Sequence, residues 1–388
     1  MLKANTGSSV LKSAKEAGLE AARKAAQGLS DIKLAFVYGS CDYNIHDMLA
    51  GVQEALPGVP LAGNTSFTGV ITPEGFVTGP DGFVGIMALT DEAMTVGTIT
   101  IARGSGTAIE DGRKAARKAM AAAGQTTPPD YFYMAASPAE EELYLKGITE
   151  IIGRVPMFGG SAADNTITGK WQLYSDKGVC ADGVVLAFFY TKKHMHNTYT
   201  GAYRETGDMG IITKISGLRT LVEIDGEPAL EKYAGWRHMD IAQLQGGALL
   251  AEAVASPLGV KDRLGDLVAI RHPMNGNADN SMAIGNNLAE GTAVLRMEAT
   301  VDELIDAVGH TLYELKRTAP NAGAYHFVHC GGRRAGIGER IDEVAAQLIK
   351  EAAGVPFIVE FTFGEYGFVE DGRNTCGGLM LSFTAFDK

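Results

Sequence analysis

The chain has 388 residues, of which 46% are hydrophobic and 21% are charged. These proportions are typical of an ordinary globular protein, and the length exceeds that at which one core usually stops growing, so we expect two domains. A formal net charge of −12 argues against nonspecific binding to nucleic acid or to an anionic membrane, because neutralising phosphate requires a surplus of Lys and Arg on one face.

Hydropathy gives no sign of a targeting or spanning segment. The first ten residues lack the apolar core of a signal peptide, and apolar runs such as 184–190 are only strand-sized. We therefore expect a cytoplasmic protein with no membrane partner. Its four cysteines form no close pair of the kind that metal knuckles or redox motifs use: Cys41, Cys180, Cys330 and Cys376.

The predicted elements begin with a helix over residues 9–27, ended by Gly28. A Val-Pro pair then recurs three times, at 59–60, 155–156 and 355–356. A strand and a helix are predicted before each pair: 34–38 and 47–56, then 131–135 and 140–152, then 325–330 and 340–352. After each pair come a glycine-bearing polar loop and a glycine-led closing strand. We interpret this pattern as internal duplication of one unit.

Residues 210–299 do not follow the repeat. They contain a strand, an Asp-Gly turn at 225–226 and a helix beginning near Pro228, since proline suits the first helical position. We place the boundary at this departure, giving an N-terminal domain of residues 30–209 and a C-terminal domain of residues 210–388. The predicted fold class is α/β (α+β), with mixed sheets built from repeated helix–strand–helix–strand units.

Polar loops after the Val-Pro pairs are candidates for ligand binding, because their backbone N–H groups could hold a carboxylate or a phosphate. Turn geometry alone also requires glycine at such positions, and neither of the first two loops has the Gly-Lys-Ser/Thr of a P-loop. In the third unit the first glycine lies further from the proline than in the other two. Its loop therefore need not bind ligand as theirs do. The candidates are Gly63, Asn64, Ser66, Gly160, Ser161, Asp164, Asn165, Gly364 and Glu365, with Arg204 in addition.

Three motifs in order resemble the FIST proteins, named for F-box and intracellular signal transduction: residues 155–164, 223–229 and 363–367. The resemblance covers nearly the whole chain and implies a two-part sensory module that binds a small ligand, with amino acids the proposed class. FIST modules are often fused to output domains, for which 388 residues leave no room. The resemblance therefore implies a stand-alone sensor that reports to a separate output protein.

Some stand-alone FIST proteins of similar length are haem proteins that sense nitric oxide and regulate a histidine kinase, and the resemblance leaves this alternative open. Haem needs an axial ligand, usually histidine. His194 and His196 are the candidates, since they face the same way if the preceding strand persists. A solvated turn is the alternative interpretation. His326 and His329 have opposite parity on a strand, and we predict no metal site.

An enzyme would need an activated nucleophile or an acid–base pair. Cys41 and the loop from Ser161 to Asp164 carry suitable groups, but none has a sequence-adjacent partner, and no Gly-x-Ser-x-Gly elbow occurs. We therefore expect a sensor without catalytic residues, with an enzyme using these groups as the alternative. Its ligand should bind at strand ends near the junction of the two parts. The sequence leaves a homo-oligomer open.

Overall fold

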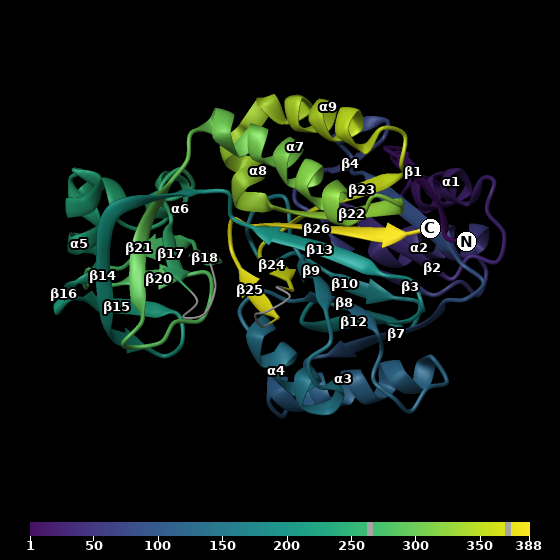
Figure 1. The fold of residues 1–388 in the computed structure, drawn as a ribbon, viewed down its shortest axis with the longest axis horizontal. Coiled ribbons are helices and arrows are strands. Elements are labelled where there is room, and N and C mark those ends of the chain that lie inside the picture. Colours follow the sequence, from purple (N-terminus) through teal and green to yellow (C-terminus); the bar gives the residue numbers. More distant parts are fainter. Residues whose placement is uncertain (262–266, 369–373) are drawn as a thin grey trace.

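The computed structural model describes residues 1–261, 267–368 and 374–388. Figure 1 shows two lobes: a large lobe containing both chain ends, and a small lobe formed by the chain from β14 to β21. The chain passes between the lobes after β13 and again before α7. The expected boundary at 209/210 falls inside β14, which continues from Arg204 to Ser216.

Three equivalent units build the large lobe. Unit 1 comprises β1 (Lys3–Ser9), α1 (Ala14–Ala26), β2 (Leu34–Gly39), α2 (Ile45–Ala55), β3 (Leu61–Thr65), β4 (Val70–Thr72), β5 (Gly75–Val77) and β6 (Val84–Thr90). Unit 2 comprises β7 (Thr95–Ala102), α3 (Ala108–Ala122), β8 (Tyr131–Ala136), α4 (Glu141–Ile152), β9 (Met157–Ser161), β10 (Leu173–Ser175), β11 (Gly178–Cys180) and β12 (Gly183–Tyr190). Unit 3 comprises β13 (Met195–Thr200), α7 (Val301–Thr318), β22 (Ala322–Cys330), α8 (Gly331–Ile337), α9 (Ile341–Ala352), β23 (Phe357–Thr362), β24 (Glu365–Gly367), β25 (Thr375–Gly377) and β26 (Leu381–Asp387).

Each unit folds into one sheet with a parallel pair at its centre. The three strand orders are β1-β6-β2-β3, β7-β12-β8-β9 and β13-β26-β22-β23, and in each the last two strands are parallel. The hairpin of every unit leaves its own sheet: β4–β5 extends β23, β10–β11 extends β3, and β24–β25 extends β9. This exchange links the three sheets in a ring. The predicted repeat and mixed sheets are confirmed.

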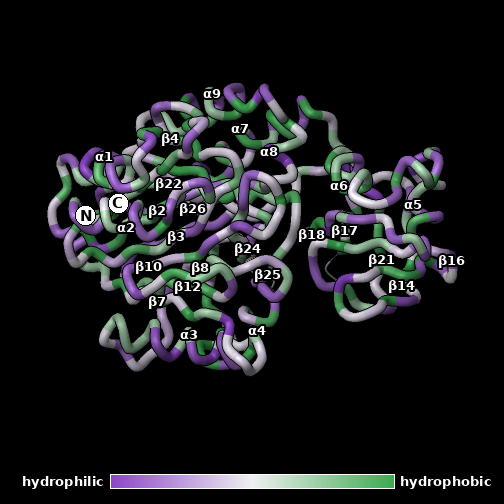
Figure 2. Tube along the Cα trace, turned by 180° about the vertical axis from the view of Figure 1, so that it is seen from behind, coloured by the Kyte–Doolittle hydropathy of each residue, from purple (hydrophilic) through white to green (hydrophobic). Residues whose placement is uncertain are grey.

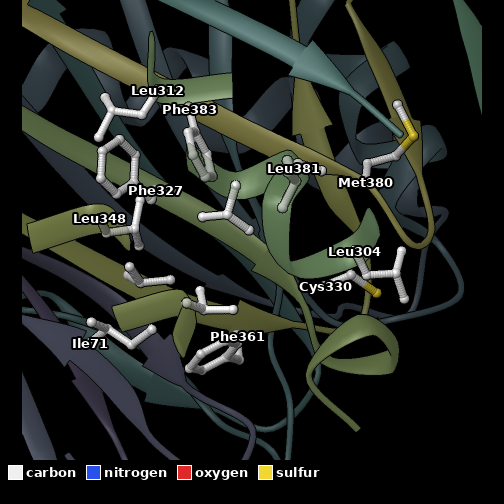
Figure 3. Close-up of a cluster of buried hydrophobic side chains, with 14 of the residues drawn as sticks. Ile71, Leu304, Leu312, Phe327, Cys330, Leu348, Phe361, Met380, Leu381 and Phe383 are labelled. Atoms are coloured by element: carbon white, nitrogen blue, oxygen red, sulfur yellow. The ribbon is translucent and has the colours of Figure 1, made fainter. Parts of the chain in front are cut away.

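Hairpin exchange also joins the hydrophobic cores. Ile71 of β4, in unit 1, is fully buried among the side chains of unit 3, beside Phe361 and near Leu348 (Figure 3). Hydrophilic and hydrophobic residues alternate along outer helices such as α3 and α9 (Figure 2), as expected for helices that cover a sheet on one face.

The first two units share a close crossing of their two helices. A Cβ added to Gly18 of α1 would lie 2.2 Å from the backbone oxygen of Met48 in α2. A Cβ added to Gly112 of α3 would lie 2.3 Å from the oxygen of Tyr144 in α4. Only glycine permits such an approach, which explains why both units have Ala- and Gly-rich helices.

The first helix differs from its prediction at its N-terminal end. Residues 3–9 form strand β1, paired antiparallel with β6, and α1 begins only at Ala14, where the Ser13 side chain accepts a hydrogen bond from the Glu16 N–H. The apolar spacing that predicts the helix begins at Val10, but residues 10–13 connect β1 to α1 instead of extending the helix.

The small lobe is an antiparallel sheet with short helices: β14 (Arg204–Ser216), β15 (Thr220–Ile224), β16 (Glu227–Pro228), α5 (Ala229–Arg237), α6 (Ala248–Glu252), β17 (Leu258–Lys261), β18 (Val268–Arg271), β19 (Pro273–Gly276), β20 (Met282–Ile284) and β21 (Ala293–Glu298). The helix predicted near Pro228 is confirmed as α5. Within the described ranges, no helix is long and apolar enough to cross a membrane.

Candidate ligand-binding site

A cavity of about 470 Å³ lies between the lobes, and we name it the interlobe cavity. Its large-lobe wall comes from the segments just after β3, β8, β9, β22 and β23, which are the carboxyl ends of the parallel strands. Crevices outside such strand ends are where open α/β sheets usually bind ligands. The small-lobe wall comes from α6, β19 and the segments next to β18 and β20.

Aromatic side chains from all three units dominate the large-lobe wall. The Phe67 and Phe363 rings lie 5.7 Å apart, and Trp171 meets Phe363 edge-on at 6.2 Å. Across the cavity stand Leu250, Val254 and Met274. A ligand between these walls would bury apolar surface against both lobes at once.

Few polar side chains line the cavity. The His272 ring shares a 2.9 Å hydrogen bond between Nε2 and the backbone oxygen of Leu250, and burial lowers its pKa to about 4, so it is neutral at pH 7. Oδ1 of Asn286 is buried and accepts no hydrogen bond from any described residue. The Cys330 thiol accepts hydrogen bonds from the Gly332 and Leu379 N–H groups, and burial raises its pKa well above its usual value.

One ion-pair cluster joins the lobes at the edge of the cavity. Arg219, between β14 and β15, contacts Glu141 at 3.0 Å and also binds Glu142, both on α4. It further donates to Oδ1 of Asn287 at 3.0 Å. Burial, together with the neighbouring Glu142, raises the pKa of Glu141 to about 7, against the opposing effect of Arg219. We name this cluster the Arg219 bridge.

The backbone at the cavity wall is locally strained. Ala139 has φ 93° and Ile167 has φ 57°, and both line the cavity. Positive φ is unfavourable for a β-branched residue and costs of order 1 to 3 kcal/mol, and such strain is concentrated at functional sites in proteins.

The loop residues predicted to bind ligand lie just behind this wall. Gly63, Asn64, Gly160 and Ser161 are buried within β3 and β9, and Ser66 and Gly364 follow β3 and β23. None of them lines the interlobe cavity, whereas their neighbours Phe67 and Phe363 do. Glu365 is also buried: it accepts hydrogen bonds from the Thr362 hydroxyl and the Met380 N–H, and burial raises its pKa to about 8.

Asp164 and Asn165 hold loops in place. The Asp164 carboxylate accepts hydrogen bonds from the backbone N–H groups of residues 166, 168, 169 and 170, which lower its pKa against the opposing effect of burial. Asn165 accepts from the Thr68 N–H at 2.8 Å and donates to Asp42 at 2.6 Å, which ties unit 2 to unit 1. Both residues therefore shape the loop that carries Ile167 and Trp171.

Arg204 lies at the first passage between the lobes rather than in the cavity. Its exposed guanidinium pairs with Glu298 at 2.8 Å and Glu303 at 2.9 Å. These carboxylates belong to β21 and α7, which flank the second passage. The three residues thus hold the two connecting segments together.

A fully buried polar cluster lies where the three units meet. Phe36, Tyr133 and His326 occupy equivalent positions on β2, β8 and β22, with ring centroids 4.7 to 5.6 Å apart. Glu360 lies 3.6 Å from His326 Nε2, and burial raises its pKa to about 8 and lowers that of His326 to about 3. The pair is therefore neutral at pH 7.

His194 and His196 line a separate cavity of about 410 Å³ near the start of β8, β9 and β13. Their ring centroids are 6.1 Å apart, and Nε2 of His196 lies 3.5 Å from the Asp387 carboxylate. A carboxylate beside one ring nitrogen, as at His196, is a common partner of histidines that bind metals. Phe158 and Phe368 supply apolar lining. Among the described residues, no group of three His, Cys, Asp or Glu could hold a metal ion.

The groups considered for catalysis are occupied in other ways. Cys41 is half-buried, accepts a hydrogen bond from the Asn165 N–H, and has its pKa raised by burial. The Ser161 hydroxyl shares a 2.7 Å hydrogen bond with the Tyr366 hydroxyl rather than with a base. Neither arrangement increases nucleophilicity.

The fold and the cavity define a two-lobed α/β protein with a site of ligand size between its lobes. The chain belongs to the FIST family: the FIST N domain matches residues 33–227 and the FIST C domain matches residues 229–367. FIST domains are sensory domains of signal transduction. The junction between the two matches lies at the start of α5, inside the small lobe.

Comparison with curated proteins gave no match. Among solved structures, cyanuric acid hydrolase from A. caulinodans is 12% identical with a TM-score of 0.36, and each chain covers 100% of the other. A second cyanuric acid hydrolase is 10% identical with a TM-score of 0.33, at 99% coverage of both chains. Phosphoribosylformylglycinamidine synthase II from Thermotoga maritima is 10% identical with a TM-score of 0.24, over 100% of this chain and 72% of that one. We draw no conclusion about function from similarity at this level.

Most residues that line the cavity have no distinguishing pattern in the sequence. His272 and Asn286 lie in Asn- and Gly-rich stretches that are typical of turns, and Phe67, Trp171 and Phe363 are indistinguishable from core aromatics. One signal was available: all three aromatics lie in or next to the loops that follow the Val-Pro pairs.

Proposed function

We propose that this protein is a sensor that binds a small metabolite in the interlobe cavity and reports the binding to a separate output protein. The observation that carries the proposal is the division of the cavity wall between the lobes, with Phe67, Trp171 and Phe363 on one side and Leu250 and Met274 on the other. A ligand touching both walls would stabilise one arrangement of the lobes, and such differential binding is what a sensor requires.

An amino-acid-like ligand with an apolar body suits the lining. Its body would lie against the aromatic side chains, and Arg219 and Asn286 would be the polar groups nearest to its charged end. We further propose that the protein does not transform its ligand, because Cys41 and Ser161 lack an activating base within hydrogen-bonding distance among the described residues. The output protein would be a histidine kinase or another signalling protein.

Thermal shift against a panel of amino acids tests the proposal. A ligand at a hundred times its dissociation constant should stabilise the fold by about 2.7 kcal/mol. The variant Ala335→Phe places a ring in the cavity from an exposed position on α8, so it should abolish the shift. The matched control Ala121→Phe adds the same ring on the exposed face of α3, outside the cavity, and should keep the shift. Equal shifts in both variants would exclude this cavity, and turnover of a stabilising compound would support an enzyme instead.

Haem binding at His194 and His196 is a second candidate, favoured by the Asp387 carboxylate beside His196. When bound, haem would supply an iron centre for nitric oxide, and the protein would contribute imidazole ligands and the apolar surface of Phe158 and Phe368. The haem-reconstituted protein should then show a Soret band that shifts in His194→Ala or His196→Ala. Absence of the band, or a band unchanged in both variants, would remove this candidate.

A further inference from the structure

A second cavity between the lobes, of about 620 Å³, adjoins the Arg219 bridge. One face of α4 forms much of its wall, through Glu142, Leu145, Lys146, Thr149 and Glu150, so we name it the α4 cavity. The opposite wall includes Arg271 and Asn287 of the small lobe. The two cavities are distinct but share a boundary, because Arg271 and Asn287 line this one whereas His272 and Asn286 line the interlobe cavity.

Arg271 is a half-buried cation that forms no ion pair with any described residue. Its Nη1 donates to the backbone oxygens of Ile270 and Cys376 at 3.1 and 3.3 Å, and its Nε is buried without a hydrogen-bond acceptor among the described residues. Among the described residues, no carboxylate lies within 4.0 Å of the Arg271 guanidinium. Burial lowers the pKa of Arg271. A desolvated guanidinium is costly unless an anion compensates it.

The carboxylates of the α4 cavity are already paired with other cations. Glu142 binds Arg219, and Glu150 lies 2.6 Å from Arg113. Lys146, in contrast, is exposed and forms no ion pair with any described residue. Lys146 and Arg271 therefore face the cavity as cations from the two lobes, and neither forms an ion pair with a described residue.

We propose that the α4 cavity binds a small oxyanion, a carboxylate or a phosphate, held between Arg271 of the small lobe and Lys146 of the large lobe. The guanidinium supplies directed hydrogen bonds to the oxyanion, and the ammonium adds a point charge. Leu145 and Cys376 supply apolar lining beside these charges. The anion would tie the lobes together beside the Arg219 bridge, independently of any ligand in the interlobe cavity.

Isothermal titration calorimetry of the full chain at low ionic strength tests the proposal, with inorganic phosphate and acetate as separate probes. At least one probe should bind saturably at one site per chain, and the tighter of the two identifies the kind of oxyanion. Arg271→Gln should weaken binding at least tenfold and Lys146→Met at least threefold. The control Lys118→Met removes an exposed lysine of α3 outside the cavity and should leave binding unchanged.

Failure of both probes to bind saturably would overturn the proposal, as would wild-type affinity in Lys146→Met together with Arg271→Gln. If Arg271→Gln does not fold, Lys146→Met and the charge reversal Lys146→Glu still decide the outcome, because Lys146 is exposed. Amino-acid binding that Ala335→Phe abolishes reports only on the interlobe cavity, so the two proposals can fail separately.

Discussion

Glu360 offers the sharpest test of how the three units are held together. Its carboxyl is fully buried, lies 3.4 Å from the Tyr133 hydroxyl, and leaves Oε2 without a partner among the described residues. Burial raises its pKa from 4.5 to about 8, so the folded protein keeps the proton over a pH range in which the unfolded chain has lost it. The stability associated with this group is therefore complete below pH 4.5 and is lost as the pH rises to about 8.

Multiplying the interval between pH 4.5 and about 8 by about 1.4 kcal/mol per pH unit gives a loss of about 5 kcal/mol, to order of magnitude. Glu360→Gln keeps the shape of the side chain but cannot ionise. We expect the variant to match the wild type near pH 5 and to become progressively more stable than it up to pH 8.

Urea denaturation followed by circular dichroism at several pH values between 5 and 8 measures this difference, provided that unfolding is reversible. Glu92→Gln, at an exposed position without an ion pair or side-chain hydrogen bond among the described residues, is the matched control. A Glu360→Gln difference that stays constant from pH 5 to pH 8 would refute the reasoning, because it would show that Glu360 does not gain a proton on folding.

Three further substitutions test other contacts of the structure. Arg219→Met leaves the buried Glu141 beside Glu142 without its cation and should cost about 3 kcal/mol in urea denaturation, with faster proteolysis between the lobes; a cost below about 1 kcal/mol would contradict the bridge. Asp164→Ala removes the acceptor of four backbone N–H groups, so the midpoint of unfolding should fall by the equivalent of about 2 to 4 kcal/mol; an unchanged midpoint would mean that water replaces the carboxylate. Gly63→Ala would place a Cβ 1.8 Å from the Val37 oxygen and should cost about 2 to 3 kcal/mol by calorimetry, whereas Gly58→Ala, where a Cβ meets nothing within 4 Å, isolates the effect of positive φ alone.

Local patterns account for the parts of the fold that could be predicted. The strands, helices and Val-Pro pairs of each unit repeat at similar spacing, because each unit satisfies the same backbone and burial requirements within one stretch of chain. The predicted loops after the first two pairs begin inside strands, because Gly63, Asn64, Gly160 and Ser161 belong to β3 and β9. The sequence predicts ligand contacts from their polar residues, whereas Asp164 and Asn165 form hydrogen bonds that hold the loops themselves.

Long-range contacts account for the parts of the fold that could not be predicted from the sequence. The hairpins leave their own units to pair with another sheet, and strands of only three residues contain no sequence signal for the edge that they join. Likewise, nothing near Arg219 predicts Glu141 as its partner, since the two lie on different lobes.

The sequence by itself determined the repeated α/β unit, the family and the departure of the middle segment from the repeat, because periodicity and motif order are properties of the chain read in order. Only the tertiary structure decided that the small lobe stands over the strand ends of the large lobe, and that Phe67, Trp171, Phe363 and His272 share one cavity. A cavity exists only where segments distant in sequence leave space between them, so its lining cannot be inferred from any one of those segments.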